Sequence, residues 1–273
     1  MLQELAERLG SRLGRDSAAI RLARPIYESI LDLATGGRGY RRCVNGRESF
    51  YIAARNRSYF PEIYDPSVCD YLRQRVRPGD TCLNVGANVG IYTLLLARWS
   101  GPNGQVYAFE PNPAVRAILE DNVRRNGCAA YVDISNQAVG DEPGEAAFFA
   151  EGVTGIGRLG RPHPASGGAS TFTVPVTTLD EFCGRHHLSP NWIVMDIEGF
   201  EIPALEGATE TLRAGLQTGL NLVVEMHPPL WSTPPLSRGR MDAVLKRHSM
   251  RPIPLAGQGK PLDENGMCLL EHF

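Results

Sequence analysis

The chain has 273 residues, 42% of them hydrophobic and 21% charged, a composition typical of globular proteins that excludes disordered and collagen-like chains. Its formal net charge of −2 argues against nucleic acid as a partner, because a phosphate backbone requires a basic surface. We expect a small-molecule partner instead. The sequence has no apolar run of about 20 residues that would span a bilayer, no signal-peptide core and no CxxC pair among its six cysteines. We therefore predict a cytoplasmic protein that does not enter a membrane.

Residues 1–65 are predicted to form an N-terminal cap. Apolar residues recur at helical spacing over 1–35 and are interrupted at Asp16 and Ser17, which predicts two helices. Asn45 and Gly46 separate two strand-like runs and predict a tight hairpin turn. The apolar faces of the two helices favour a homodimer.

Residues 66–273 are predicted to form a larger domain in which helices and strands alternate. We expect helices over 66–76, 89–99, 113–126, 178–187, 201–214 and 236–247, and strands at 81–85, 105–109, 130–134, 191–197 and 220–226, followed by two edge strands at 251–255 and 266–271. Such alternation predicts an α/β fold with a mostly parallel sheet covered by helices on both faces, because parallel neighbours need crossover connections.

The stretch 144–176 is less regular. Strand-like runs at 145–150 and 172–176 flank residues 152–171, which are rich in Gly, Pro and Ser. This composition predicts a mobile loop, which is either a plain surface connection or a lid over an active site.

A glycine-bearing turn follows the first strand of the larger domain. Gly86 permits a tight bend beside a ligand, and Gly90 permits the next helix to approach the sheet closely. The start of that helix presents N–H groups and the positive end of its dipole to a carboxylate or phosphate. We therefore assign Gly86, Asn88 and Gly90 to a cofactor pocket.

Glu110 ends the second strand, about 20 residues beyond this turn, where an α/β nucleotide site places a carboxylate that binds ribose hydroxyls. The order of strand, turn, helix, strand and acid predicts a cofactor that contains adenosine. Sites for dinucleotides favour glycine where this turn has Asn88. S-adenosylmethionine is therefore favoured over NAD as the cofactor.

Two further strands end in polar side chains at the same predicted edge of the sheet. We expect Asp196, Glu198 and His227 to surround a methyl acceptor as catalytic residues, and we interpret Glu201 as a helix cap. His227, with an ordinary pKa near about 6.5, would act as the base, or Asp196 or Glu198 would do so if burial raises its pKa. Alternatively, these three residues hold a Mg²⁺-like ion. The sequence does not separate these alternatives, so no metal ligand is assigned.

Several motifs over roughly residues 60–228 resemble the FkbM family of methyltransferases: Asn84-Val-Gly-Ala-Asn-Val-Gly-Ile-Tyr-Thr, Tyr107-Ala-Phe-Glu-Pro-Asn-Pro, Ala138-Val-Gly-Asp, Thr178-Leu-Asp, Asp196-Ile-Glu-Gly-Phe-Glu, Leu205-Glu-Gly-Ala and Val224-Glu-Met-His. The resemblance implies a Rossmann-like class I methyltransferase fold with a seven-stranded sheet, and O-methylation of a small natural product or sugar. On the matching motifs it implies that further residues contact S-adenosylmethionine, namely Asn84, Ala87, Pro111, Asn112, Ala138 and Asp196.

Two positions depart from the family pattern. Asn84 stands where the family usually has Asp, so a charge for the cofactor's ammonium group is absent, although the amide oxygen still accepts a hydrogen bond. Val194 stands where the family commonly has Lys. These departures keep a non-catalytic cofactor-binding protein open as an alternative, beside an NAD-dependent oxidoreductase.

Overall fold

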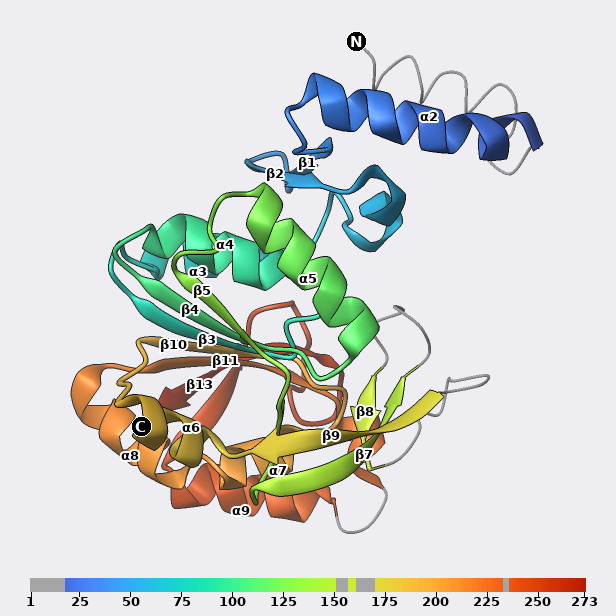
Figure 1. Cartoon of the computed structure of the whole chain (residues 1–273). Coiled ribbons are helices and arrows are strands. Elements are labelled where there is room, and N and C mark those ends of the chain that lie inside the picture. Colours follow the sequence, from blue (N-terminus) through green and yellow to red (C-terminus); the bar gives the residue numbers. More distant parts are fainter. Residues whose placement is uncertain (1–17, 151–156, 161–169, 233–235) are drawn as a thin grey trace.

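The computed structural model describes residues 18–150, 157–160, 170–232 and 236–273. Its centre is a seven-stranded sheet in the order β12-β13-β11-β10-β3-β4-β5 (Figure 1). The strands are β3 (Thr81–Val85), β4 (Gln105–Phe109), β5 (Val132–Ser135), β10 (Trp192–Met195), β11 (Asn221–Met226), β12 (Met250–Pro254) and β13 (Gly266–His272). Among them β13 runs antiparallel to both of its neighbours, while β5, β4, β3, β10 and β11 pair in parallel. The predicted mostly parallel seven-stranded sheet is confirmed.

Helices cover both faces of this sheet (Figure 1). One face carries α3 (Pro66–Arg75), α4 (Ile91–Ser100) and α5 (Pro113–Arg125), and the other carries α6 (Leu179–His186), α7 (Glu201–Glu206), α8 (Thr209–Thr218) and α9 (Arg238–Arg247). Successive residues of a strand belong to opposite cores, because side chains alternate between the two faces of a sheet. Cys82 and Val194 belong to the first core, whereas Leu83 and Ile193 belong to the second.

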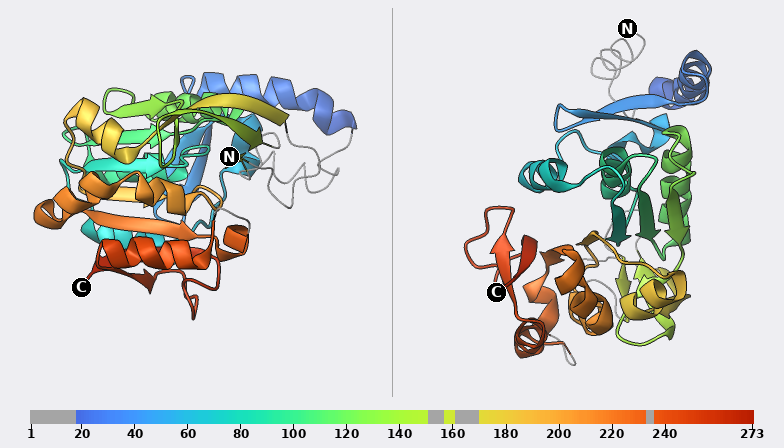
Figure 2. Two further views of the ribbon diagram at one scale, coloured as in Figure 1. Left: turned by 90° about the horizontal axis from the view of Figure 1, so that it is seen from below. Right: turned by 90° about the vertical axis from the view of Figure 1, so that its left-hand side faces the viewer.

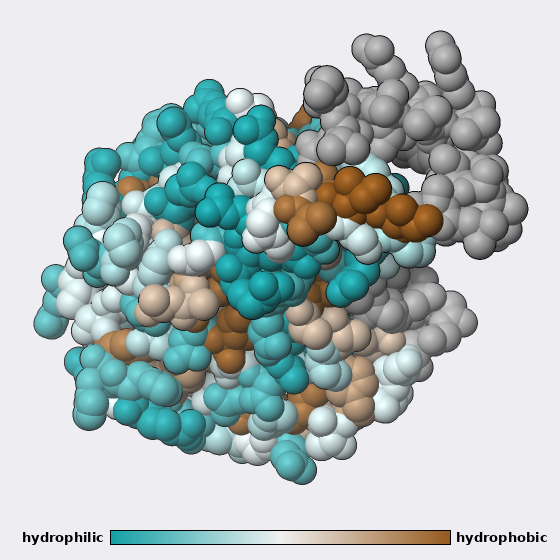
Figure 3. Space-filling model, turned by 45° about the horizontal axis from the view of Figure 1, so that its top comes forward, coloured by the Kyte–Doolittle hydropathy of each residue, from teal (hydrophilic) through white to brown (hydrophobic). Residues whose placement is uncertain are grey.

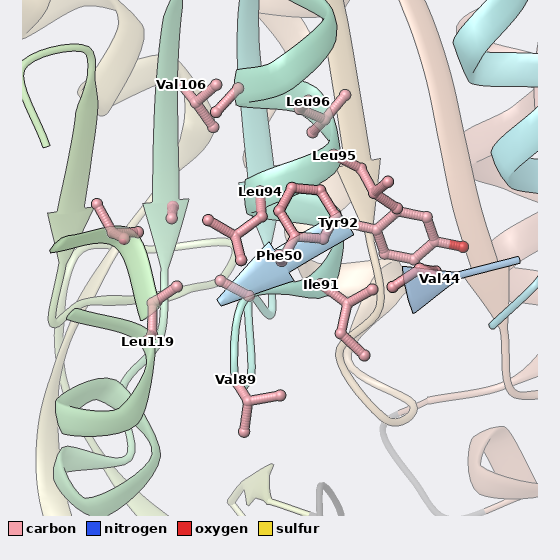
Figure 4. Packing of buried hydrophobic residues seen from close by; sticks show 14 of the residues in the cluster. Val44, Phe50, Val89, Ile91, Tyr92, Leu94, Leu95, Leu96, Val106 and Leu119 are labelled. Carbon is pink, nitrogen blue, oxygen red and sulfur yellow. The ribbon is translucent and has the colours of Figure 1, made fainter. Parts of the chain in front are cut away.

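The N-terminal cap packs onto the first of these cores. It consists of α2 (Ala18–Ala34), β1 (Tyr40–Val44), β2 (Glu48–Ile52) and the short 3-10 helix η1 (Ala54–Tyr59). Asn45 and Gly46 have φ angles of 51° and 67°, which confirms the predicted hairpin turn. Phe50 of β2 lies among Leu94, Leu95 and other side chains of the first core (Figure 4). The first predicted helix, within residues 1–17, lies outside the described residues.

Helix α2 lies at the periphery of the molecule, beyond the hairpin (Figure 1). Ile26, Ile30 and Leu33 are 66%, 47% and 86% exposed. They recur at helical spacing and form an apolar stripe, visible as brown side chains along the helix in Figure 3. The expected homodimer stays a prediction.

A second, four-stranded sheet forms a separate layer (Figure 2). Its order is β6-β9-β7-β8, with β6 (Ala138–Val139), β7 (Gly144–Ala150), β8 (Arg158–Leu159) and β9 (Ser170–Thr177). The two predicted strand-like runs correspond to β7 and β9. The loop prediction is wrong for residues 157–160, where Arg158 and Leu159 are buried and pair with β7. The rest of that predicted loop, apart from the start of β9, lies outside the described residues.

Residues 201–214 were expected as one helix but form two, α7 and α8. The chain breaks at Gly207, where an added Cβ would lie 2.2 Å from the backbone oxygen of Gly140. The carboxylate of Asp180 in α6 accepts hydrogen bonds from the N–H groups of Glu210 and Thr211 at the start of α8. The break is therefore stabilised by a cap from a different helix.

The C-terminal strands differ from expectation in one respect. β13 is an interior strand between β11 and β12, so of the two strands predicted at the edge only β12 lies there. The Pro-rich segment after β11 begins with a second 3-10 helix, η2 (Pro228–Ser232). Within the described part of the chain, no helix is both long enough and apolar enough to cross a membrane.

Candidate functional site

A pocket lies at the carboxyl ends of β3, β4 and β10, with a volume of about 700 Å³ that includes its opening to solvent. The chain proceeds from β3 to β4 and β5 on one side, and later returns to β10 and β11 on the other. A reversal of strand order of this kind leaves a crevice at the strand ends, which is where open α/β sheets bind ligands. Phe148 of β7 and Leu159 of β8 line the same pocket, so the second sheet forms one of its walls.

The turn after β3 is held by hydrogen bonds within the protein. The N–H groups of Gly86 and Ala87 donate to the backbone oxygen of Phe109, and that of Asn88 donates to Glu110 Oε2 at 2.8 Å. Asn88 has a φ angle of 50°. The N–H groups of Gly86, Ala87 and Asn88 are thus already paired within the protein, and Gly86 and Asn88 both line the pocket. The expectation that the N–H groups at the start of α4 face a ligand stays a prediction.

The two glycines of the turn have different neighbours. A Cβ on Gly86 would lie 1.8 Å from the backbone oxygen of Asp196, so Gly86 allows the ends of β3 and β10 to approach each other. A Cβ on Gly90 would lie 2.4 Å from Leu119 of α5, so this glycine serves the contact between two helices rather than between helix and sheet. Gly90 is not among the residues that line the pocket.

Glu110 is 6% exposed and lies in the pocket wall. Its Oε2 accepts from Asn88 N–H and its Oε1 from Asn112 N–H, both at 2.8 Å. Burial raises the pKa of Glu110 to about 7, against the opposing effect of those two N–H donors and of Arg116. Each carboxylate oxygen has a second lone pair, so Glu110 can also accept hydrogen bonds from a ligand.

The remaining predicted cofactor residues divide into two groups. Pro111, Asn112 and Ala138 line the pocket. Ala87 and Asn84 do not: Asn84 is 1% exposed, accepts a hydrogen bond from Thr93 Oγ1 at 2.8 Å and faces the first core. The cofactor-binding role expected for Asn84 is therefore not supported by its position, because its side chain points away from the pocket. The presence of Asn84 where the family usually has Asp therefore affects the protein interior and leaves the charge of the pocket unchanged.

Asp196, Glu198 and His227 do lie together. Asp196 and Glu198 line the pocket, while His227 is buried behind them. His227 Nε2 lies 3.5 Å from Glu198 Oε2 and 3.9 Å from Asp196 Oδ1. Glu198 has a φ angle of 50°, a strained conformation for a residue with a side chain, and such strain is concentrated at functional sites.

Glu201 is more than a helix cap, contrary to expectation. Its side chain is fully buried, and its Oε1 lies 2.8 Å from His227 Nδ1 and accepts from Gly199 N–H at 2.7 Å. Its Oε2 accepts from Trp231 Nε1 at 2.8 Å. Glu201 thus fixes the orientation of the imidazole ring and directs Nε2 toward the pocket.

Glu225, at the end of β11, is a member of the site that sequence reasoning missed. Its Oε1 lies 3.9 Å from His227 Nε2. Burial and the neighbouring charge of Asp196 raise its pKa to about 8. Met195 and Val224 are partners in the parallel register of β10 and β11, so the residues that follow them in the chain, Asp196 and Glu225, also meet.

The cluster changes the charge expected for His227. Burial alone would lower its pKa, but the hydrogen bond and charge of Glu201, with the charges of Asp196 and Glu198, raise the pKa to about 10. The raised pKa favours the protonated imidazolium, which cannot accept a proton from an acceptor. The role of His227 as the base stays a prediction. Burial also raises the pKa of Asp196, to about 6, and that of Glu198.

The family model for the methyltransferase FkbM domain matches residues 84–250. The chain is 45% identical over 76 residues to 31-O-demethyl-FK506 methyltransferase FkbM of Streptomyces tacrolimicus, a match that covers 27% of this chain and 28% of that protein.

Among solved structures, the chain is similar to methyltransferase FkbM from Methylobacillus flagellatus KT, with 17% identity and a TM-score of 0.47 over 74% of this chain and 50% of that one. It is also similar to Aeropyrum pernix fibrillarin in complex with S-adenosyl-L-methionine, with 14% identity and a TM-score of 0.44 over 75% of this chain and 73% of that one.

The strand order and the pocket at the strand ends define the class of protein, a Rossmann-like α/β domain of the class I methyltransferase fold. Within that class, the family model matches well over half of the chain. The chain belongs to the FkbM methyltransferase family.

Proposed function

We propose that this protein transfers a methyl group from S-adenosylmethionine to a hydroxyl oxygen of a small natural product or sugar. The observation that carries the proposal is a single pocket with Glu110 on one wall and the carboxylates of Asp196 and Glu198 on another. The relative from Streptomyces is named for a methyltransferase of 31-O-demethyl-FK506, which supports an oxygen acceptor on a natural product.

The residues of the pocket fit this cofactor. Glu110 is a buried carboxylate with lone pairs available for ribose hydroxyls. Phe109 and Val139 supply apolar surface for an adenine ring, and Gly86 leaves no side chain between the turn and the strand ends. When bound there, S-adenosylmethionine supplies an electrophilic methyl group.

The chain's own residues then have two tasks, to align the acceptor and to remove its proton. Glu198 faces the pocket, and burial raises its pKa, so it is a stronger base than an exposed glutamate. Asp196 lies beside it as a second acceptor of hydrogen bonds. His227, held by Glu201, stabilises the negative charge of both carboxylates.

Glu198→Gln tests the acceptor half of the proposal. We expect turnover to fall by about 10²-fold or more, the usual contribution of a general base, while the affinity for S-adenosylhomocysteine changes little. Asp133→Asn, on an exposed residue of β5, is the matched control. Full turnover in Glu198→Gln would remove this residue from the mechanism.

Glu110→Ala tests the cofactor half. Loss of buried hydrogen bonds should weaken S-adenosylhomocysteine binding by about 1–3 kcal/mol in calorimetry. Unchanged affinity would contradict the ribose assignment. A parallel titration with NADH distinguishes the oxidoreductase alternative, which requires the nicotinamide cofactor to bind more tightly.

A further inference from the structure

The imidazole of His227 is surrounded by more acidic groups than it can neutralise. Glu201 occupies its Nδ1 side, and Asp196, Glu198 and Glu225 surround Nε2 at 3.5–3.9 Å. One imidazole ring therefore faces four carboxyl groups, and any of them that ionises beyond the first adds negative charge that the imidazolium does not offset. Buried charges without partners are costly, so this end of the pocket is suited to hold additional positive charge.

Three of these residues have the geometry of a coordination sphere. One ligand atom each from Asp196, Glu225 and His227 lies within 4.8 Å of the other two. Ligands at about 2.0–2.2 Å from one ion are separated by up to about 4.4 Å, so small side-chain adjustments would bring all three onto the same ion. Of the carboxylates near Nε2, the geometry thus selects Glu225 rather than Glu198, the residue that the sequence suggested for a metal.

One atom directed into this space lacks the partner that a buried polar atom normally has. Asp196 Oδ1 is buried and has no hydrogen-bond partner among the described residues. The side chain of His227 is 6% exposed, and its Nε2 approaches the surrounding carboxylates no closer than 3.5 Å, the outer limit of a hydrogen bond.

Glu201 supplies the support that such sites use. A histidine that binds a metal ion through one nitrogen usually has its other nitrogen hydrogen-bonded to a carboxylate, which fixes the ring. Glu201 occupies that position at His227 Nδ1 and is itself held by Trp231 and Gly199.

We propose that Asp196, Glu225 and His227 form a binding site for a divalent cation. Two carboxylates and one imidazole suit an ion that accepts both oxygen and nitrogen donors, and Mn²⁺ is the appropriate probe. Because Asp196 lines the pocket, the cation lies at the pocket wall, where it orients an acceptor oxygen. Only this last role rests on the proposed methyl transfer, since cation binding is measured without it.

The test is a titration of the full chain with Mn²⁺ in the absence of cofactor, with free Mn²⁺ measured by its electron paramagnetic resonance signal. We expect one site per chain. Glu225→Gln and Asp196→Asn should weaken binding at least tenfold, and Glu201→Gln by about 10- to 100-fold through loss of ring orientation. Asp133→Asn should bind as the wild type does.

Calorimetry with S-adenosylhomocysteine shows whether Glu225→Gln is folded, because Glu225 does not line the pocket, whereas circular dichroism shows it for Asp196→Asn, because Asp196 does line the pocket. Absence of Mn²⁺ binding at millimolar concentration in a protein that binds S-adenosylhomocysteine overturns the cation site and leaves the proposed function intact. Mn²⁺ binding that persists in both Glu225→Gln and Asp196→Asn also overturns it, since the ion then binds elsewhere. Mn²⁺ binding without S-adenosylhomocysteine binding contradicts the proposed function alone.

Discussion

At the scale of single residues, Gly86 lies where the turn after β3 contacts the end of β10. The space that its Cβ would occupy is taken by the backbone oxygen of Asp196, and its φ angle is 81°. The close contact between Gly86 and Asp196 therefore constrains both the turn after β3 and the position of Asp196 at the end of β10. A substitution here should affect both.

Gly86→Ala should reduce stability by about 1–3 kcal/mol more than Gly101→Ala does, because backbone cannot move aside as a flexible side chain can. Gly101 also has a positive φ angle, 67°, but nothing lies within 4 Å of an added Cβ, so it reports the conformational cost alone. Urea unfolding of both variants measures the difference. Equal losses would mean that the loop shifts freely.

The ribose contact proposed for Glu110 predicts that cofactor affinity depends on pH. If ribose hydroxyls donate to the carboxylate, binding favours the ionised form, and a pKa of about 7 leaves Glu110 mostly protonated at pH 6. We expect the affinity for S-adenosylhomocysteine to fall about tenfold from pH 8 to pH 6. Glu110→Gln should lack this component in calorimetry across the same range. An identical pH profile in the variant would refute it.

The raised pKa of Glu110 also affects the stability of the free protein, which changes with pH in the direction opposite to the change in cofactor affinity. The folded-state pKa of Glu110 lies above the ordinary value of 4.5. The unfolded chain therefore releases this proton first, and the free protein loses stability as pH rises from about 4.5 to about 7.

Single residues of the site were predicted to different degrees. Glu110, Asp196 and Glu198 could be placed in the pocket from the sequence, because each follows an apolar strand and parallel strands end at one edge. Glu225 follows the same rule, but its meeting with Asp196 depends on the register of β10 and β11, which a sequence does not state. Glu201 resembled a cap because its burial depends on Trp231, 30 residues away.

At the scale of elements, α8 depends on a side chain from another helix. Asp180→Ala removes the acceptor for the N–H groups of Glu210 and Thr211 and should cost about 1–2 kcal/mol, as for the loss of a helix cap. Asp242→Ala is the control, since Asp242 pairs with Arg238 on the surface, where such pairs contribute little. Equal unfolding free energies for the two variants would argue against the cap.

Elements with regular periodicity were predictable, and those defined by distant partners were not. The strands and helices of the parallel sheet follow from alternating apolar runs and turn residues. The division of α7 from α8 depends on the contact of Gly207 with Gly140, which are far apart in the chain. β8 has two residues and exists only through pairing with β7, so it left no pattern in the sequence.

At the scale of the whole molecule, the cap is linked to the larger domain through Asn126, at the end of α5. Its side chain accepts from Tyr51 N–H at 2.9 Å and donates to Tyr51 O at 2.8 Å. Asn126→Ala should cost about 1–3 kcal/mol and accelerate hydrogen exchange of the Tyr51 amide. Asn136→Ala, at an exposed position, is the control. Unchanged exchange at Tyr51 would show that the hairpin is held without this pair of hydrogen bonds.

The assembly of the molecule was predicted only in outline. Strand and helix alternation indicated one parallel sheet, whereas the position of β13 inside that sheet and the second sheet arise from long-range pairing. The homodimer and the cytoplasmic location stay predictions. Light scattering of the full chain at micromolar concentration measures the former directly.

The indole of Trp231 contacts the buried carboxylate of Glu201, so its fluorescence reports on the surroundings of that carboxylate. Its Nε1 donates to the same carboxylate that holds His227, so any change in the charge of that imidazole alters the field at the ring. The chain has three tryptophans, and replacement of the other two by phenylalanine would leave a single intrinsic fluorophore beside the strand ends. Its emission would then record occupancy of the site in real time, without a label or a chromogenic substrate.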